Sequence, residues 1–190
     1  MPTPTTQPTL KSEIREALKN QRSKISAEHS LAEGFRALKF FRSHYKKFDH
    51  WLLYAPIQNE ISTEPLYAEL KSHQKKIYFP RIEKEKINFY QVSDWSELKK
   101  SSYTIEPSEK STKLSTSEKV VVVVPGIAFS RFGHRIGFGK GFYDRYLNEH
   151  PEFFRIGFGY DIQILMNDWK IDSNDESMNQ IICPSGFFDT

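Results

Sequence analysis

Five consecutive valines, Val120–Val124, constrain the fold more than any other part of the chain. β-Branched residues favour strands, and an uninterrupted apolar run of this length is typical of a strand that is covered on both faces. Pro125 and Gly126 end the run, because this pair marks a turn or loop. The next segment therefore leaves the carboxyl end of a buried strand, which is the edge where α/β proteins bind ligands.

Strands and helices are predicted to alternate on both sides of this strand. The predicted strands lie at 51–56, 76–80, 87–92, 154–158 and, last, 181–183, and the predicted helices at 63–72, 141–149 and 161–167. A strand–helix–strand order favours parallel pairing with right-handed crossovers. We therefore predict a single three-layer α/β/α domain at 10–190, in which helices flank a mainly parallel, Rossmann-like open sheet.

Two amphipathic helices are predicted before the first strand, and each follows a hydroxyl residue that can cap it, Thr9 or Ser26. The predicted apolar stripes are Leu10, Ile14, Ala17 and Leu18 in the first helix and Leu31, Phe35, Leu38 and Phe41 in the second. Lys11 and Arg15 lie four residues apart and therefore share a face of the first helix. On its own, such a pair is ordinarily a solvated helix face.

The composition limits the class of protein. With 190 residues, 38% of them apolar and 27% charged, the chain can bury one substantial core. The formal net charge is only +3 and both signs are interspersed, so we expect no nucleic-acid partner. A single cysteine, Cys183, excludes an intrachain disulfide framework and a cysteine-rich metal site. No apolar run approaches the length of a membrane span, and we expect a cytoplasmic monomer with no membrane partner.

Two segments are expected to be poorly ordered. Residues 1–9 are rich in proline and threonine and lack the apolar stretch of a secretion signal, so they are predicted to form a disordered tail. Residues 101–119 are rich in Ser, Thr, Lys and Glu. They are predicted to form an exposed, mobile loop within the domain and not a domain boundary.

The segment after the buried strand is rich in glycine and basic residues. Backbone amides without a Cβ can approach an anion closely, and this segment has four such positions, Gly133, Gly137, Gly139 and Gly141. Arg135 and Lys140 add positive charge, and the helix predicted to follow adds the positive end of its dipole. The loop is therefore suited to phosphate, although such a turn can also be a purely structural connection.

The spacing of the loop excludes the common phosphate-binding motifs. Lys140 is followed by a glycine and not by a hydroxyl residue, and His134 stands where a P-loop requires its first glycine. Phe142 occupies the third glycine position of the dinucleotide-binding motif. Asp144 lies beside the positive charge, either as a salt-bridge partner or as an oxygen ligand for Mg²⁺.

A second set of candidate ligand-binding residues combines one carboxylate with aromatic rings. Glu60 follows the carboxyl end of the first predicted strand, where it can accept paired hydrogen bonds from an amino-substituted heterocycle. Its alternative interpretation is an exposed loop acid or a charge at a helix N-terminus. Tyr54, Phe142 and Tyr143 can stack on a flat ring, but isolated aromatic residues are more often part of a core.

Beyond its first nine residues, nearly the whole chain resembles the 5-formyltetrahydrofolate cyclo-ligases, also called 5,10-methenyltetrahydrofolate synthetases. The segments that carry the resemblance are Lys11–Arg15, Gln58–Thr63, Phe79–Arg81, Pro125–Phe129 and Gly133–Asp144. The last of these is specific, and the others occur in the family's order. The resemblance implies an ATP- and Mg²⁺-dependent enzyme that cyclises 5-formyltetrahydrofolate to 5,10-methenyltetrahydrofolate. The formyl oxygen is phosphorylated on the way, and ADP and phosphate are released.

The resemblance also implies roles for individual residues. ATP would be bound by Lys11, Arg15, Gly133, His134, Arg135, Gly137, Gly139, Lys140 and Gly141. The folate would be bound by Tyr54, Glu60, Phe142 and Tyr143, and Mg²⁺ by Asp144 and Asp175. Arg135, Lys140 and Tyr143 would be the catalytic residues.

Two departures from the family's pattern bear on activity. Ser130 stands where the family usually has an aspartate, and Cys183-Pro184 replaces a common Thr-Glu pair after the final strand. The loss of a charge at Ser130 leaves an alternative open, a non-catalytic nucleotide- or folate-binding relative. Asp175 falls where the family carries an aspartate, although the sequence around it is divergent.

Overall fold

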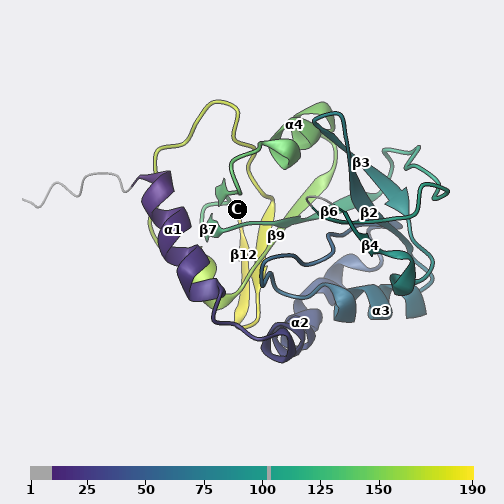
Figure 1. Cartoon of the computed structure of the whole chain (residues 1–190), viewed down its shortest axis with the longest axis horizontal. Helices are drawn as coiled ribbons and strands as arrows, with labels where there is room; N and C mark the ends of the chain where they lie inside the picture. The colour runs from purple at the N-terminus through teal and green to yellow at the C-terminus, as the bar shows by residue number, and fades with distance from the viewer. Residues whose placement is uncertain (1–9, 102–103) are drawn as a thin grey trace, which may run out of the picture.

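A seven-stranded mixed sheet forms the centre of the molecule (Figure 1). The computed structural model describes residues 10–101 and 104–190, and the predicted tail at 1–9 lies outside them. The strands of the sheet are β1 (His50–Leu52), β2 (Lys76–Glu83), β3 (Lys86–Gln91), β6 (Val120–Pro125), β9 (Phe154–Phe158), β11 (Gln180–Cys183) and β12 (Gly186–Asp189). The helices are α1 (Lys11–Arg22), α2 (Ala27–Phe41), α3 (Glu64–Ser72) and α4 (Phe142–Glu149).

The strand order is β12-β11-β9-β6-β1-β2-β3. The five inner strands pair in parallel, whereas β12 and β3 are antiparallel to their neighbours at the two edges. From β1 the chain continues toward one edge of the sheet, to β2 and β3. From β6 it continues toward the other edge, to β9 and β11, so the strand order switches direction between β1 and β6. Ligands of open α/β sheets bind beyond the carboxyl ends of the strands at such a point.

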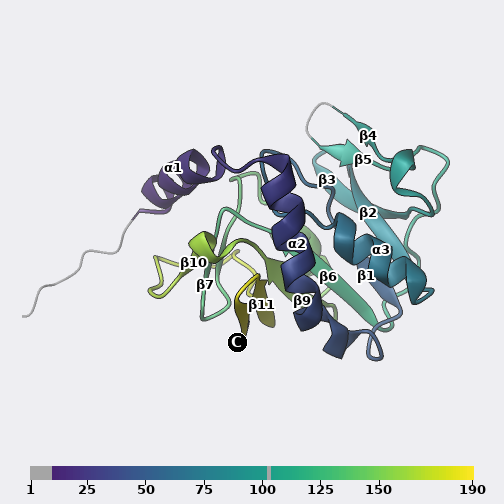
Figure 2. The same ribbon diagram turned by 90° about the horizontal axis from the view of Figure 1, so that it is seen from below.

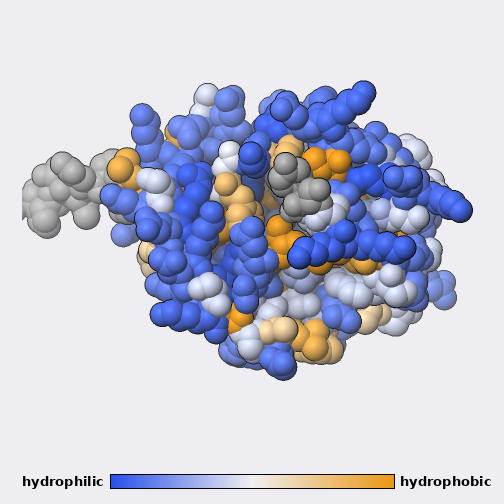
Figure 3. Space-filling model, viewed as in Figure 1, coloured by the Kyte–Doolittle hydropathy of each residue, from blue (hydrophilic) through white to orange (hydrophobic). Residues whose placement is uncertain are grey.

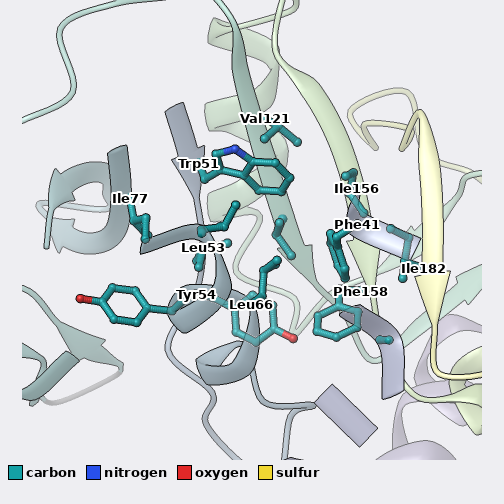
Figure 4. Close-up of a cluster of buried hydrophobic side chains, with 14 of the residues drawn as sticks. Phe41, Trp51, Leu53, Tyr54, Leu66, Ile77, Val121, Ile156, Phe158 and Ile182 are labelled. Carbon is teal, nitrogen blue, oxygen red and sulfur yellow. The ribbon is translucent and has the colours of Figure 1, made fainter. Parts of the chain in front are cut away.

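The predicted α/β fold is confirmed, with helices on both faces of a mainly parallel sheet. β6 is buried along its whole length, as predicted. Val121 and Val123 lie in the core cluster that also contains residues of α2 and α3, part of which Figure 4 shows. Val120, Val122 and Val124 lie in the cluster on the opposite face, with residues of α4. In Figure 2, α2 and α3 lie side by side across their face of the sheet.

Short elements surround this centre. The described residues include three 3₁₀ turns, namely η1 (Arg42–His44), η2 (Trp95–Glu97) and η3 (Asp161–Gln163). A small sheet joins β7 (Ala128–Ser130), β8 (Arg135–Ile136) and β10 (Ile164–Leu165), and a hairpin joins β4 (Lys99–Lys100) and β5 (Ile105–Glu106). Helix α1 packs against β7 at one end of the molecule (Figure 1). Its N-cap residue is Leu10, and the predicted cap, Thr9, lies outside the described residues.

Helix α2 corrects one predicted apolar stripe. Ser26 caps the helix as predicted and accepts a hydrogen bond from the His29 N–H at 3.1 Å. Of the predicted stripe, Leu38 and Phe41 are buried, but Leu31 and Phe35 are exposed. The buried face instead includes Gly34, because a Cβ there would collide with the Ser62 carbonyl oxygen. Close backbone packing against the segment before α3 turns the two larger side chains outward.

The carboxyl-terminal part of the chain departs from the prediction in two ways. The helix predicted at 161–167 is only one 3₁₀ turn, after which the chain pairs with β7 as β10. The predicted last strand exists as β11, but a tight turn at Pro184-Ser185 returns the chain as β12. Ser185 is held there by Asp161, which accepts hydrogen bonds from its N–H at 3.1 Å and its hydroxyl at 2.7 Å.

Part of the serine-rich segment runs along the edge of the sheet. The Gln91 N–H donates to the Thr112 carbonyl at 2.8 Å, and the Leu114 N–H donates to the Phe89 carbonyl at 2.8 Å. Glu106, in β5, contacts β2, because its Oε1 accepts a hydrogen bond from the Ile82 N–H at 3.1 Å. The first two bonds satisfy polar groups on the exposed edge that β3 would otherwise present, and the third satisfies an N–H of β2. Mobility of residues 101–119 stays a prediction.

Candidate active site

A cleft of about 1070 Å³ lies at the switch point of the sheet. Its walls come from α1, the residues after β1, the end of β6, the glycine loop with the first turn of α4, and the β2–β3 hairpin. Single-ligand pockets range from about 300 to 1,000 Å³, so this cleft has room for two small molecules side by side. The face that Figure 3 shows is mostly hydrophilic, with a smaller apolar area near its centre.

All but two of the predicted site residues line this one cleft. The lining includes Lys11, Arg15, Tyr54, Glu60, Arg135, Gly137, Gly139, Lys140, Gly141, Phe142, Tyr143, Asp144 and Asp175. The structure does not bring Gly133 or His134 to it. A Cβ on Gly133 would lie 2.8 Å from the Met178 carbonyl oxygen, and Nδ1 of His134 lies 2.8 Å from Asp168 Oδ1. Gly133 therefore serves close packing, and His134 faces another part of the surface.

Arg135 and Asp144 form an ion pair in the wall of the cleft. Arg135 Nη2 donates to Asp144 Oδ1 at 2.8 Å, and Nη1 donates to the Pro125 carbonyl at 3.2 Å. Only 5% of the Arg135 side chain is exposed, so its orientation is fixed by packing as well as by these bonds. Of the two interpretations left open for Asp144, the salt-bridge partner is present. Its second oxygen, Oδ2, has no hydrogen-bond partner among the described residues.

The glycine loop is packed tightly against arginine side chains. A Cβ on Gly137 would lie 2.6 Å from Arg135 Nη1, so a larger residue there would displace the guanidinium. The Gly137 carbonyl accepts a hydrogen bond from Arg15 Nε at 2.9 Å. Gly141, at φ +64°, is the left-handed residue from which α4 begins. The loop thus requires glycine at some positions for space and at others for conformation.

Helix α1 presents a row of cations to the cleft at intervals of four residues, namely Lys11, Arg15 and Lys19. Lys11 Nζ lies 2.6 Å from Asp172 Oδ2 and also pairs with Asp175. Burial alone would lower the pKa of Lys11, but its hydrogen bonds to the two aspartates outweigh burial and raise that pKa. Lys11 therefore stays charged, and Asp175 reaches the cleft as its partner. The solvated-face interpretation of Lys11 and Arg15 is wrong, because both line the cleft.

Glu60 is the buried carboxylate of the site. It is 5% exposed, and burial raises its pKa to about 7, although a hydrogen bond from Ile57 and the charge of Arg22 act in the opposite direction. Its Oε2 accepts the Ile57 N–H at 3.0 Å, whereas Oε1 has no partner among the described residues. The alternative of an exposed loop acid is therefore wrong. An unpaired buried carboxylate oxygen is costly, and a hydrogen-bond donor on a ligand would remove that cost.

The predicted aromatic residues differ in their surroundings. Tyr54 is 3% exposed, and its hydroxyl donates to the Ile61 carbonyl at 2.9 Å, so it supports the cleft from the core. The Tyr143 hydroxyl has no hydrogen-bond partner among the described residues, and burial holds the pKa of this phenol far above its usual range. The Arg135 guanidinium lies 5.8 Å from the Tyr143 ring. Tyr143 therefore offers a neutral hydroxyl inside the cleft.

Sequence reasoning missed several residues of the lining. Lys19 continues the four-residue spacing of Lys11 and Arg15, which is a signal that was readable. Phe138 lies between the predicted glycines, with Lys19 Nζ 5.5 Å from its ring. Arg145 donates to the Lys140 carbonyl at 3.0 Å and to the Glu85 carbonyl at 2.9 Å. No sequence pattern indicated that last link, which ties the glycine loop to the β2–β3 hairpin.

The two departures from the family pattern lie outside the cleft lining. Ser130 is fully buried, and its Oγ accepts the N–H groups of Phe132 and His134, each at 3.3 Å. Serine and aspartate share this turn-forming role, so Ser130 can replace an aspartate here without altering the cleft. Cys183 is buried in β11, and burial raises its pKa, so it is a poor nucleophile.

No three His, Cys, Asp or Glu side chains within 10–101 and 104–190 are grouped so as to hold a metal ion by themselves. Across the same residues, no helix is both long and apolar enough to cross a membrane.

The open sheet and the basic cleft at its switch point are those of an α/β enzyme that binds small molecules. The model of the 5-formyltetrahydrofolate cyclo-ligase family matches residues 7–184, and the chain belongs to this family. It is therefore a ligase, and the predicted family is confirmed.

Individual relatives agree with this assignment. The mouse 5-formyltetrahydrofolate cyclo-ligase is 26% identical over 153 residues, which is 73% of this chain and 75% of the relative. The probable 5-formyltetrahydrofolate cyclo-ligase of Caenorhabditis elegans is 25% identical over 190 residues, or 91% and 92% of the two chains. The solution structure of Aquifex aeolicus 5,10-methenyltetrahydrofolate synthetase superposes with a TM-score of 0.79 at 25% identity, covering 95% of this chain and 93% of that one.

Proposed function

We propose that this protein converts 5-formyltetrahydrofolate to 5,10-methenyltetrahydrofolate with consumption of ATP. One observation carries the proposal: the same cleft holds a row of cations beside a glycine loop and a buried carboxylate, Glu60, with an unpaired oxygen. The first feature is suited to a polyphosphate, and the second to the amino-substituted ring of a pterin. Family membership and the names of the relatives support this activity.

The reaction needs ATP because a formamide oxygen is a poor leaving group. The formyl oxygen attacks the γ-phosphorus, the bond to the bridging oxygen breaks, and ADP leaves. N10 then attacks the activated formyl carbon, the carbon–oxygen bond breaks with departure of phosphate, and the N10 proton passes to solvent. No covalent bond to the protein is required, so the protein contributes mainly positioning and charge neutralisation.

The cationic wall would bind the triphosphate. Arg15 uses only its Nε for the Gly137 carbonyl, which leaves the rest of its guanidinium for phosphate oxygens. Lys140 is exposed at the cleft and has no ion-pair partner among the described residues, so its charge is available to a ligand. Arg135 is already oriented by Asp144 and Pro125, which suits it to stabilise charge that develops during phosphoryl transfer.

The folate would bind beside Glu60 and Tyr143. An ionised Glu60 can accept hydrogen bonds from the amino group and ring N–H of a pterin. The neutral Tyr143 hydroxyl can donate to the formyl oxygen or to a phosphate oxygen next to it. Phe142 and Tyr54 line the same cleft and add apolar surface for a flat ring.

The site also fits Mg²⁺ in the manner usual for nucleotide enzymes. Mg²⁺ is typically held by one or two carboxylates together with substrate phosphates, so a cluster of three protein ligands is not required. Asp144 and Asp175 would hold it, because both line the cleft and each has an oxygen without a partner among the described residues. When bound, the ion would neutralise phosphate charge.

Incubation with 5-formyltetrahydrofolate, ATP and Mg²⁺ tests the proposal. We expect the near-ultraviolet absorbance band of the methenyl product to grow, with ADP formed in equal amount, and no band when ATP is omitted. If both substrates bind without product, the protein is instead a non-catalytic relative. The position of Ser130 favours the catalytic enzyme, because this residue caps a buried turn and is not part of the cleft lining. A cytoplasmic, monomeric enzyme remains a prediction.

A further inference from the structure

Arg22 is a buried cation for which the proposed mechanism has no use. It ends α1 and is 2% exposed. Its Nε and Nη2 donate to the Gln58 carbonyl at 3.1 and 2.9 Å, and its Nη1 donates to the Gly126 carbonyl at 3.0 Å. Within the described residues no carboxylate forms an ion pair with it. A buried charge that is satisfied only by carbonyl oxygens is costly, and in some proteins such a group fixes a particular arrangement.

The first segment that Arg22 holds is the turn that leads to Glu60. Gln58 and Asn59 are consecutive non-glycine residues with left-handed backbones, at φ +47° and +58°. This conformation is uncommon for glutamine and better tolerated by asparagine, and strained backbone of this kind persists when the surroundings support it. Arg22 fixes the Gln58 carbonyl, and the Tyr160 hydroxyl donates to the Asn59 carbonyl at 3.2 Å. The direction in which Glu60 leaves the turn therefore depends on these external bonds.

The second segment is the glycine loop together with the end of β6. Gly126 directly follows β6, and its carbonyl also accepts a hydrogen bond from Gln163 Nε2 at 2.8 Å. The Arg22 guanidinium lies 5.4 Å from the ring of Phe138, and Lys19 lies 5.5 Å from the same ring. Phe138 is the neighbour of Gly137, whose carbonyl is bound by Arg15. One face of α1 thus contacts both the glycine loop and the turn before Glu60.

We propose that Arg22 is a positioning residue that locks the Gln58–Glu60 turn and the glycine loop into one arrangement, so that the phosphate and folate halves of the cleft are assembled together. The inference rests on the proposed function, because it assigns the two halves to the two substrates. Arg22 itself contacts neither substrate in this scheme. It acts through Glu60 on one side and through Phe138 on the other.

The charge of Arg22 allows a second, independent test, because it acts on the pKa of Glu60. Among the described residues, the titratable groups that face Glu60 are Arg22 from α1, Tyr54 after β1, Tyr143 from α4 and Tyr160 after β9. Of these, only Arg22 carries a positive charge, and it holds the pKa of Glu60 below the value that burial alone would give. Removal of the charge should therefore raise that pKa further.

Three variants of the full chain separate positioning from stability. Arg22→Met removes the charge and the hydrogen bonds, whereas Arg22→Lys keeps the charge but cannot bridge two carbonyls with a planar fork. Arg155→Met is the matched control, because Arg155 is also largely buried and donates to the Leu147 carbonyl at 3.1 Å, but it does not line the cleft. For each variant we would measure KM for both substrates, the unfolding temperature, and the Glu60 pKa by carbon-13 NMR of the carboxylate.

In Arg22→Met we expect KM for 5-formyltetrahydrofolate to rise about 10- to 100-fold, KM for ATP to rise less, and the Glu60 pKa to rise. Arg22→Lys should keep the Glu60 pKa but raise KM for the folate. Arg155→Met should lower only the unfolding temperature. KM is decisive because it does not depend on the folded fraction, and Arg22→Met values within about twofold of wild type would overturn the inference. Arg22→Lys is judged by the same KM criterion if Arg22→Met does not fold.

Failure of the proposed function would look different. In that case the wild-type protein itself would make no methenyl product, and kinetics would say nothing of Arg22. The NMR titration needs no substrate and then decides: an unchanged Glu60 pKa in Arg22→Met would overturn the inference, and a raised one would support it.

Discussion

The two walls of the cleft are prepared for their ligands by different means. On the cationic wall, basic side chains already form ion pairs with aspartates of the protein: Arg135 with Asp144, and Lys11 with Asp172 and Asp175. On the other wall, Glu60 is buried with one oxygen unpaired, and its pKa is raised to about 7. The first wall is fixed by ion pairs between side chains of opposite charge. On the second wall, Glu60 is held by a hydrogen bond from the Ile57 N–H, and its carboxyl group can gain or lose a proton near neutral pH.

The difference reflects what each wall would bind. A triphosphate brings several negative charges, and cations held in place by aspartates can exchange part of their pairing for phosphate oxygens without moving far. A pterin brings neutral donors, and a carboxylate binds those best when it is dehydrated and has a free oxygen. Substitutions on the two walls should therefore have effects that differ in size and in pH dependence.

The largest effect is expected on the cationic wall, from Arg135→Ala. The guanidinium is almost fully buried and held by three groups, so no other side chain can take its place. We expect kcat/KM to fall about 30- to 1000-fold, which corresponds to about 2 to 4 kcal/mol of lost transition-state stabilisation. Arg131→Ala is the control, because Arg131 is exposed in the same segment but does not line the cleft. Equal turnover in the two variants would remove Arg135 from the mechanism.

The next effect tests the other wall through Glu60→Gln. An amide cannot accept two hydrogen bonds from a pterin as a carboxylate does, so KM for 5-formyltetrahydrofolate should rise about 10- to 100-fold. Glu60 is ionised above its pKa of about 7. Wild-type kcat/KM for the folate should therefore increase as pH rises through 7, and this increase should be absent from the variant. A pH profile of unchanged shape in Glu60→Gln would show that another group titrates.

The same substitution should make the protein more stable. Folding raises the pKa of Glu60 from 4.5 to about 7, so the folded state binds the proton more tightly than the unfolded state. Its contribution to stability is fully present below pH 4.5 and is lost as pH rises through 7. Above pH 7 the wild type carries a penalty of up to about 3 kcal/mol, which Glu60→Gln lacks.

Denaturant unfolding at pH 5 and pH 8 measures this penalty. We expect the variant to gain stability over wild type at pH 8 and to gain much less at pH 5. A gain of equal size at both values would mean that packing, and not ionisation, is responsible. If Glu60 binds the folate as proposed, such a cost is the usual exchange of stability for function.

The parts of this molecule that could be predicted are those fixed by local pattern. Val120–Val124 predicted a buried strand because β-branched runs have few other stable arrangements, and the alternating faces of β6 confirm it. The parallel pairing of the inner strands followed from the strand–helix order. By contrast, the outward turn of Leu31 and Phe35 depends on the contact of Gly34 with a carbonyl far away in sequence, which no helical period encodes.

The candidate site also combines residues that a local sequence pattern indicated with residues that depend on distant contacts. The predicted site residues within the glycine-loop motif lie at the cleft, apart from Gly133 and His134, whose contacts with Met178 and Asp168 come from distant segments. Glu60 was expected at the right edge of the sheet, but the burial that raises its pKa could not be read from a loop sequence. Arg22 was missed because its partners are carbonyl oxygens, which carry no sequence signal.

The smallest effect is expected from Lys19→Met, which tests how far the cationic wall extends along α1. Lys19 is exposed, lies over the Phe138 ring and has no ion-pair partner among the described residues. Exposed charges are screened, so KM for ATP should rise only about two- to fivefold, and the difference should shrink as salt is added. Lys39→Met is the matched control, because Lys39 lies 4.8 Å from the Phe40 ring on a surface outside the cleft lining. If both variants change KM for ATP by the same factor, Lys19 does not contribute to ATP binding, and the functional part of the cationic wall ends at Arg15.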